Sequence, residues 1–494
     1  MDGESREVEL KFTLDPARGP EILAWLGQGR RPSRLVLTSI YYDTADRALH
    51  GAGFALRVRD DNGGWIQAVK SRLATGGKFG RGEWEAAVTG PVPDLAVARR
   101  TPAKRALGAG VRLETVFTVR VERSAVEIRT PDSVIEACLD SGQVEACDRR
   151  ARVDELELEL KSGSPLALFT LAHRLQETWP VGLSVVTKAD RGFALAHDGA
   201  LGARHFQAPR LTARMTAGEA FRAMARAAVE QIVWNAELLR AAPTPEAIHQ
   251  TRVGLRRLRA TLRTFKRVAA DGRALALTAR LKWLAGELDP ARDLDVFIEG
   301  AWDRAAAAHD RSGDDANLRA ARTAAYARAQ AAARDPRLGE LVLGLLSWIE
   351  AGPWTFDDAD GARPRDRSLV RFAMAALEKG RARLLEAGSD LSRLDTETRH
   401  RLRIRAKGLR YAADVFDQVF HEHPKRARRF LAALEGLLEA LGDLNDIATA
   451  RVLAPTFTPS PDVLALEAAR ERTLVERAEA AFKQFRAVKP YWRH

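Results

Sequence analysis

The chain has 494 residues, of which 46% are hydrophobic and 29% are charged, and its formal net charge is +12. Such a length predicts two or three domains, and the balance of apolar and charged residues excludes a disordered chain. Residues 1–205 hold 29 Lys and Arg against 28 Asp and Glu, which leaves 49 against 38 for residues 206–494. The positive excess of the C-terminal part therefore predicts an anionic partner there.

Cysteine content and hydropathy argue against two further classes of protein. Cys138 and Cys147 are the only cysteines of the sequence, too few for a disulfide framework and without the spacing of a metal site. The sequence shows no signal-like N-terminus and no apolar run of about 18 residues. We therefore expect a cytoplasmic protein that binds no membrane.

Residues 1 to about 200 alternate between apolar and polar side chains, as strands do. The clearest such segments are Glu7–Phe12, Phe54–Arg59, Thr118–Val121 and Glu155–Leu160. Turn residues separate them at Asn62–Gly64, Thr75–Gly77 and Asp140–Gly142. The pattern predicts a mostly antiparallel sheet or barrel.

The polar faces of these strands each carry one sign of charge. Glu7 and Glu9 share one strand, Arg57 and Arg59 a second, and Glu155, Glu157 and Glu159 a third. Like charges two residues apart lie on one face and repel each other. Inside a barrel the acidic faces would hold cations and the basic faces an anion, but alternation alone leaves a solvent-facing arrangement equally open.

From about residue 200 the pattern changes from strands to helices. Residues 201–215 contain Gly202 and Pro209 and are expected to form a linker. Thr216–Glu219 is typical of a capping box, and Thr244-Pro245 predicts a second helix start. We expect breaks between helices at Asp289-Pro290, Asp335-Pro336, Gly352-Pro353 and His423-Pro424.

Two helical segments repeat one charged pattern, His-x2-Arg-x3-(Arg/Lys)-x2-Arg. The first stripe is His249, Arg252, Arg256 and Arg259, and the second stripe is His400, Arg403, Lys407 and Arg410. At about 100° per residue, all four side chains of a stripe fall within an arc of roughly 80°. A solvated helix face would intersperse acidic residues, yet residues 252–267 contain none. The repetition therefore favours two stripes that face one shared anion.

A second pair of segments repeats in step with the stripes. Leu284–Leu288 leads to Arg292-Asp293, and Leu438–Gly442 leads to Asn445-Asp446. The C-terminal region is therefore expected to contain two related helical bundles, each pairing a basic helix with an apolar one. We interpret Asp293, Asp295 and Asp446 as helix caps or arginine partners in preference to catalytic groups.

The N-terminal 198 residues resemble the CYTH superfamily of triphosphate tunnel metalloenzymes. The resemblance is carried by ExExK at Glu7, Glu9 and Lys11, Tyr42–Thr44, Leu56–Arg59, Lys70, Arg81–Glu85, Arg120, Arg123, Leu139–Gly142, the ELELELKSG segment and Lys188–Gly192. It implies an antiparallel tunnel in which the triphosphate is bound by Lys11, Arg57, Arg59, Lys70, Arg120, Arg123 and Lys188.

The same resemblance implies a site for a divalent metal ion. Its ligands would be Glu7, Glu9, Asp140, Glu155, Glu157 and, less firmly supported, Glu159. Glu7, Glu9 and Lys11 would serve catalysis, with a metal-activated or carboxylate-oriented water attacking the terminal phosphorus. Carboxylate and phosphate oxygens suit Mg²⁺ or Mn²⁺ and do not suit zinc.

Residues 216–490 resemble the CHAD domain, whose signature is the two stripes, and this resemblance implies binding of inorganic polyphosphate. The expected architecture is thus a multidomain α+β protein: an antiparallel β-barrel tunnel (residues 1–200), the linker, and an all-α domain of two related bundles (216–490). RNA sites interleave exposed aromatics with cations, which the stripes lack apart from Tyr411, and this argues against nucleic acid.

The expected function is hydrolysis of inorganic tripolyphosphate in the tunnel and binding of polyphosphate by the helical domain. Two alternatives stay open from the sequence. One is a polyphosphate-binding or targeting protein without enzymatic activity. The other is a tunnel enzyme that acts on an organic triphosphate, either a nucleotide or thiamine triphosphate.

Overall fold

The computed structural model describes residues 5–61, 63–71, 80–108, 110–197, 199–308, 316–356, 363–457 and 460–493. The chain forms two compact units that are each built from two separate stretches of sequence. Unit 1 comprises residues 1–204 and 335–357, and unit 2 comprises residues 205–334 and 358–494. The sequence placed the domain boundary in a linker at residues 201–215 and assigned residues 335–357 to the helical domain, whereas residues 335–357 belong to unit 1.

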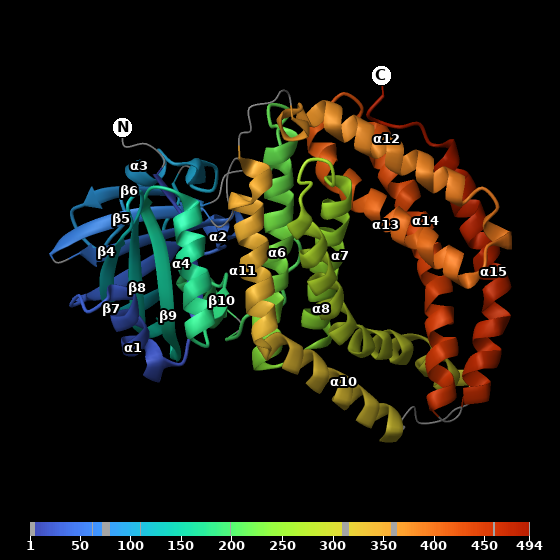
Figure 1. Ribbon diagram of the computed structural model, residues 1–494, viewed down its shortest axis with the longest axis horizontal. Coiled ribbons are helices and arrows are strands. Elements are labelled where there is room, and N and C mark those ends of the chain that lie inside the picture. Colours follow the sequence, from blue (N-terminus) through green and yellow to red (C-terminus); the bar gives the residue numbers. More distant parts are fainter. Residues whose placement is uncertain are drawn as a thin grey trace. The chain divides into compact units, whose positions relative to one another are not determined.

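Unit 1 is built on one ten-stranded sheet in which all paired strands run antiparallel (Figure 1). The strand order is β1-β6-β5-β4-β3-β7-β8-β9-β2-β10. The strands are β1 (Ser5–Glu7), β2 (Glu9–Thr13), β3 (Ser33–Asp43), β4 (Phe54–Asp61), β5 (Gly64–Ser71), β6 (Arg81–Val88), β7 (Glu114–Arg129), β8 (Val134–Ala146), β9 (Arg149–Ser162) and β10 (Gly182–Ser184).

The N-terminal segment links the two sides of this sheet. β1 pairs with β6, while β2, one residue further along the chain, pairs with β9 and β10. The Leu160 amide also donates a hydrogen bond to the carbonyl of Val8, the residue between the two strands. The expected barrel is therefore an antiparallel sheet bridged by β1–β2 and not a strictly closed ring of strands.

One expected turn lies inside a strand. Asp140–Gly142 forms the middle of β8, and β8 ends at Ala146. The turn that follows contains Cys147 with φ of 53°. A Cβ atom on Gly142 would lie 2.0 Å from the Arg120 carbonyl oxygen, so glycine here serves close backbone packing and not a turn. The expected turn at Thr75–Gly77 lies outside the described residues.

Six helices complete unit 1. They are α1 (Gly19–Gly27), α2 (Ala48–Gly51), α3 (Leu95–Ala98), α4 (Pro165–Thr178), α5 (Lys188–His197) and α11 (Pro336–Ala351). α11 packs against α4 and β10, as Figure 1 shows for α4. A Cβ atom on Gly339 of α11 would lie 3.0 Å from the Gln176 side chain of α4. This apolar packing explains why α11 belongs to unit 1 although its neighbours in sequence do not.

The regular elements that the structure describes in unit 2 are all helices. Its helices are α6 (Ala217–Ala241), α7 (Pro245–Thr264), α8 (Gly272–Phe297), α9 (Asp303–Ala308), α10 (Ala316–Arg334), α12 (Leu369–Ala387), α13 (Thr396–Phe416), α14 (Pro424–Leu453) and α15 (Ser460–Ala487). The capping box of Thr216 and Glu219 and the Thr244 N-cap are both confirmed. α8 instead runs through Pro290, because Leu288, Ala291 and Leu294 remain buried on one face.

The expected linker is an ordered part of unit 2. Leu211 is buried, and its amide donates a hydrogen bond to the Gln418 side chain at 3.1 Å. Gln418 in turn donates to the Pro209 carbonyl at 2.9 Å. Arg257 of α7 lies over the Phe206 ring at 4.2 Å from its centroid. The segment lacks regular secondary structure, but these contacts hold it against the helices of unit 2.

The expected duplication of the C-terminal region stays a prediction. Each basic helix does pack on the helix that follows it in the sequence, α7 on α8 and α13 on α14. In the first pair, Arg252 forms an ion pair with Asp289 and lies 3.8 Å from Asp293. In the second pair, His400 contacts Asn445. Each basic helix thus lies against an apolar helix that supplies polar partners for its stripe.

Candidate functional site

Unit 1 contains a cavity of about 340 Å³ lined by side chains from several strands. Most of the predicted phosphate and metal residues reach it because they occupy alternate positions on their strands. The cavity is lined by the predicted residues Glu9, Lys11, Arg57, Arg59, Lys70, Arg123, Asp140, Glu157, Glu159 and Lys188. One-sign strands therefore face a shared interior and not solvent.

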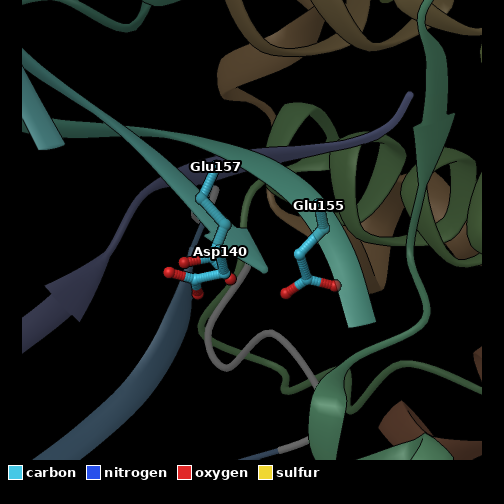
Figure 2. Close-up of side chains that lie close together, drawn as sticks. All are labelled: Asp140, Glu155 and Glu157. Carbon is cyan, nitrogen blue, oxygen red and sulfur yellow. The ribbon is translucent and has the colours of Figure 1, made fainter. Parts of the chain in front are cut away.

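Three carboxylates lie close together at this cavity, and two of them, Asp140 and Glu157, line it. Asp140 comes from β8, and Glu155 and Glu157 come from β9. One oxygen of each lies within 4.8 Å of an oxygen of the other two (Figure 2). Asp140 and Glu155 are cross-strand partners, and both are buried. Carboxylates this close repel one another unless cations lie between them.

Lys11, Arg123 and Lys188 supply those cations. The Lys188 Nζ lies 2.7 Å from Asp140 and 3.0 Å from Glu157, and it also contacts Glu155. Lys11 contacts Glu157 and lies 3.3 Å from Glu155. Arg123 donates two hydrogen bonds to Asp140, at 2.7 and 2.6 Å, and one to Glu157 at 2.7 Å. The bidentate contact fixes the guanidinium plane.

The proximity of opposite charges controls the ionisation of this cluster. Burial alone would raise the pKa of Asp140 and Glu157, but the neighbouring cations outweigh it and hold both pKa values below their ordinary range. Burial would lower the pKa of Lys11 and Lys188, but the carboxylates raise both above the ordinary value. All four groups are therefore charged at neutral pH.

A second basic wall carries carboxylates that the sequence did not assign to the site. Glu83 and Glu85 of β6 line the cavity. Glu83 lies 3.4 Å from Arg57 and 3.1 Å from Lys70, and Glu85 lies 3.6 Å from Arg57. The sequence did contain a signal for these two carboxylates. They alternate within the segment Arg81–Glu85 and therefore share one face of the strand.

Among the predicted ligands whose side chains the structure describes, Glu9 and Glu159 lie outside the group of three carboxylates. Glu9 lines the cavity 3.9 Å from the Lys11 Nζ and lies opposite Glu159 in the β2–β9 pairing. Glu159 accepts a hydrogen bond from Lys161 at 2.8 Å. The backbone of Glu7 ends β1, but its side chain lies outside the described residues. The expected set of six ligands thus contains a compact core of three.

Arg120 lies on the opposite face of β7 from Arg123. Val119, Val121 and Arg123 line the cavity, whereas Arg120 is exposed and pairs with Gln143 of β8. Side chains alternate along a strand, so two positions separated by three residues cannot share a face. The prediction that Arg120 and Arg123 contact the same triphosphate is therefore not supported, and Arg120 is not part of the proposed site.

The donor set fits a hard divalent cation. Asp140, Glu155 and Glu157 offer only carboxylate oxygens, which Mg²⁺ and Mn²⁺ prefer, and the described part of the cavity lining contains no histidine. The three carboxylates already pair with Lys11, Lys188 and Arg123. A metal ion bound by the three carboxylates would neutralise their charge in place of Lys11, Lys188 and Arg123. These three basic side chains could then bind a phosphate chain.

In unit 2 the two stripes lie on neighbouring helices, because α7 packs beside α13. Arg252 and Arg256 of the first stripe interact electrostatically with Arg403 and Lys407 of the second. The Nε atoms of Arg256 and Arg403 are buried and have no hydrogen-bond partner among the described residues. Buried donors without partners cost free energy, so they favour a ligand that accepts from them.

Burial and neighbouring positive charges lower the pKa values of basic residues in the stripes, whereas the pKa values of Lys11 and Lys188 in unit 1 are raised. Burial, Arg403 and Arg256 lower the pKa of Lys407 to about 6. Burial, with Arg292 and Arg256, lowers the pKa of His249 to about 4. Burial lowers the pKa of Arg252 to about 10, with Asp293 only partly offsetting it. The stripes therefore concentrate positive charge that the neighbouring carboxylates neutralise only in part.

The surroundings of the stripes agree in part with the sequence. Asp295 accepts hydrogen bonds from Arg322 and Tyr326, as an arginine partner should. Burial raises the pKa of Asp446.

Arg257 lies over the Tyr411 ring, 4.5 Å from its centroid, beside the second stripe. His400 is exposed, and its Nδ1 contacts the Asn445 Oδ1 at 2.6 Å. Arg259 and Arg410 complete the stripes, with Arg410 donating to Glu435.

Models of two known families match the chain. The CYTH domain model matches residues 5–193 and the CHAD domain model matches residues 223–455. The chain is therefore a protein with an N-terminal CYTH domain and a C-terminal CHAD domain. Among the described residues, no helix has the length and hydropathy needed to cross a membrane.

Similar proteins were found by comparison of sequences and of structures. An inorganic triphosphatase from Haemophilus influenzae is 27% identical over 201 residues, which are 38% of this chain and 55% of that protein. The chain therefore spans only about half the length of this curated relative. The CHAD domain from the plant Ricinus communis is 27% identical, covering 59% of this chain and 99% of that one, with a TM-score of 0.49. PptA from Streptomyces chartreusis is 18% identical, covering 55% and 99%, with a TM-score of 0.38.

Proposed function

We propose that unit 1 hydrolyses inorganic tripolyphosphate with Mg²⁺ or Mn²⁺. The observation that carries this proposal is the cluster of Asp140, Glu155 and Glu157 interlocked with Lys11, Arg123 and Lys188 at one cavity, which all of these residues except Glu155 line. A chain of phosphates and a divalent ion need opposite charges within a few ångströms of each other. The CYTH match and the triphosphatase relative support the same reading.

The proposed roles of the cavity residues differ with the sign of their charge. Lys11, Arg123 and Lys188 would bind oxygens of the triphosphate and stabilise the charge that develops as the terminal bridging P–O bond breaks. A metal ion bound by Asp140, Glu155 and Glu157 would polarise phosphate oxygens and lower the pKa of a bound water. Glu9 lines the same cavity without belonging to the three-carboxylate group, so it is placed to orient the attacking water and accept its proton.

The opposite wall would position the rest of the chain. Arg57 and Lys70 line the cavity and share Glu83 as a partner. Contacts with phosphate oxygens there would hold the non-reacting phosphates while the terminal one is attacked. Arg57 and Lys70 of this wall, with Glu83 as their shared partner, suit a chain of phosphates, and we therefore propose inorganic tripolyphosphate as the substrate.

Replacing one of the three carboxylates tests this proposal. Glu157→Gln keeps the size of the side chain but removes a metal ligand and a partner of Lys11, and we expect phosphate release from tripolyphosphate to fall by a factor of about 10² or more. The matched control is Glu122→Gln, on the exposed opposite face of β7. Equal activity of the native protein and Glu157→Gln would refute the proposed centre.

A substrate panel separates this activity from the alternatives. Tripolyphosphate, a nucleoside triphosphate and thiamine triphosphate are compared at equal metal concentration, with phosphate release as the readout. Faster turnover of an organic triphosphate would replace the inorganic substrate in the proposal. No turnover of any of the three, together with intact polyphosphate binding, would favour the binding protein without enzymatic activity.

We propose further that the two stripes of unit 2 bind inorganic polyphosphate. The observation that carries this proposal is the convergence of Arg256, Arg403 and Lys407, which form no ion pair among the described residues. A polymer with one negative charge on each phosphate and no base to recognise needs closely spaced cations. The stripes supply these without the exposed stacking aromatics of a typical RNA site.

Binding of polyphosphate is expected to take up protons. Lys407 has a pKa of about 6 in the free protein because of burial, Arg403 and Arg256. A bound polyanion favours the charged form and raises this pKa. Lys407 is thus neutral in the free protein but protonated in the complex over a pH window that begins near 6, so affinity falls as the pH rises through that window.

Calorimetric titrations at pH 7.5 in two buffers of different ionisation enthalpy measure this uptake. The control is Lys407→Arg, which stays charged in both states and is expected to lose the Lys407 share of the uptake. Identical heats in both buffers for the native protein would contradict the prediction.

A further inference from the structure

Unit 2 contains a cavity of about 480 Å³ at the end of the second stripe. It is lined by residues of α8, of the first turns of α13, of α14 and of α15. α14 packs against the other three helices, and Figure 1 shows α13, α14 and α15 next to one another. His400, the first residue of the second stripe, also lines this cavity, but most of the wall has no role in the polyphosphate site proposed above. The volume is in the range of sites for small organic molecules.

One wall of the cavity is an apolar strip on α14. The strip consists of Leu441, Leu444, Ala448 and Val452, which follow one another at helical spacing. Val452 is 75% exposed, so the strip continues to a rim where a large apolar side chain meets water. Asn445 and Thr449 lie beside the strip and also line the cavity, which adds an amide and a hydroxyl group to its border. This pattern suits a nucleobase, because the faces of a base are apolar and its edges carry hydrogen-bonding groups.

The same cavity carries two arginines that share one carboxylate. Arg399 of α13 and Arg451 of α14 both form ion pairs with Glu471 of α15. Arg451 and Arg399 hold the pKa of Glu471 below its ordinary value, so all three groups are charged at neutral pH and one positive charge is in excess. The Nε atom of Arg399 is buried and has no hydrogen-bond partner among the described residues. An anionic group that accepts from this atom would remove the cost of leaving it unpaired.

We propose that this cavity binds a nucleoside monophosphate, with the base against the apolar strip of α14 and the phosphate on Arg399 and Arg451. Inorganic phosphate would contact the arginines but leave the apolar strip exposed to water. An uncharged nucleoside would cover the strip but leave both arginines with a single carboxylate. A nucleoside monophosphate meets both requirements of the cavity.

The position of the cavity gives nucleotide binding a consequence for the stripes. Because His400 belongs to the cavity and to the second stripe, the nucleotide and polyphosphate are expected to compete for unit 2. This consequence rests on the polyphosphate binding proposed above, whereas the nucleotide site itself does not. Saturating nucleotide should weaken polyphosphate binding by about fivefold or more, and polyphosphate should weaken nucleotide binding by the same factor.

The experiment titrates adenosine monophosphate and guanosine monophosphate into the full chain and measures their affinity by calorimetry. Both should bind at least about tenfold more tightly than inorganic phosphate or adenosine. Arg399→Gln is expected to weaken their binding by about tenfold. Glu471→Gln frees both arginines and should strengthen it by about threefold, a gain that a misfolded protein could not show. The matched control is Glu476→Gln, an exposed glutamate of the same helix, which should leave the affinity near native.

Two results would overturn the nucleotide site. One is that the monophosphates bind no more tightly than inorganic phosphate, because the apolar strip would then contribute nothing. The other is that the native protein, Arg399→Gln and Glu471→Gln bind them equally, because the nucleotide would then lie elsewhere in the protein.

Parallel measurements with polyphosphate separate this site from the proposed function. If the nucleotide binds as expected while charge reversal at Arg252 and Arg403 leaves polyphosphate binding intact, the proposed function of the stripes fails and the nucleotide site stands. If that reversal abolishes polyphosphate binding and the native protein binds no nucleotide, only the nucleotide site is overturned. If both ligands bind without affecting each other, the expected competition at His400 is wrong.

Discussion

A fragment that ends at residue 204 is expected to be unstable, although it contains every strand of the sheet and the whole candidate centre. The reason is α11, which the chain supplies from residues 336–351 and which packs on α4 and β10. Gly339 marks the face towards α4, and Val342, Leu343 and Leu346 follow on that face at helical spacing and are buried. Deleting α11 leaves the surface that it covers exposed to water.

The size of the effect follows from the burial of these side chains. Each fully buried Val or Leu contributes about 1.5–3 kcal/mol, so three of them approach the 5–15 kcal/mol that is roughly the whole stability of a domain. Deleting α11 exposes β10 together with α4. Ser184 of β10 pairs with Lys11, which lines the cavity. We therefore expect the fragment to aggregate or to melt far below the full chain, and to lose triphosphatase activity with its fold.

A reconstructed unit 1 provides the matched control. Residues 1–204 joined through a long Gly/Ser linker to residues 335–357 should be monomeric in size-exclusion chromatography and should melt cooperatively by circular dichroism. It should also release phosphate from tripolyphosphate. A bare 1–204 fragment that matches the reconstructed protein in melting temperature and activity would show that α11 is dispensable.

The strand pattern predicted which side chains share a face, but it left open whether that face lines a cavity or meets solvent. Glu155, Glu157 and Glu159 alternate with leucines, and the same alternation that defines a strand places all three on one face. The pairing of β8 with β9 then fixes Asp140 beside Glu155. Pairing between distant strands is not contained in any local pattern, so the compact group of three carboxylates could not be separated from Glu9 and Glu159 by sequence alone.

The errors have a common physical origin in tertiary packing. Gly142 is typical of a turn, but it lies in β8 because a neighbouring backbone leaves no room for a side chain. Pro290 is typical of a helix end, but α8 continues because its buried leucines outweigh one lost hydrogen bond. α11 carries a continuous apolar sequence whose partner cannot be read from it. In each case a local preference was weaker than a contact made elsewhere in the chain.

Charge reversal at Arg252 and Arg403 is expected to abolish polyphosphate binding, with a loss of affinity of at least about 100-fold. The two residues come from different stripes and interact electrostatically with each other. Phosphate release from tripolyphosphate by unit 1 should change little in this variant. Binding is measured by titration calorimetry and hydrolysis by phosphate release. The control is Arg405→Glu, an exposed position of α13 two residues from Arg403 and therefore on another helix face.

A second variant excludes simple unfolding as the cause of that loss. Glu at position 252 would lie beside Asp289 and Asp293, so the charge reversal also introduces repulsion. Arg256→Gln with Lys407→Gln avoids this problem, because neither residue has an ion-pair partner among the described residues. Burial of Lys407 next to Arg403 and Arg256 costs free energy in the unliganded protein, as its pKa of about 6 indicates. Removing these two charges should therefore raise the melting temperature of the free protein while it lowers the affinity for polyphosphate. If these cations served only the fold, the same variant would give the opposite result. Its melting temperature would fall, and its affinity for polyphosphate would stay unchanged.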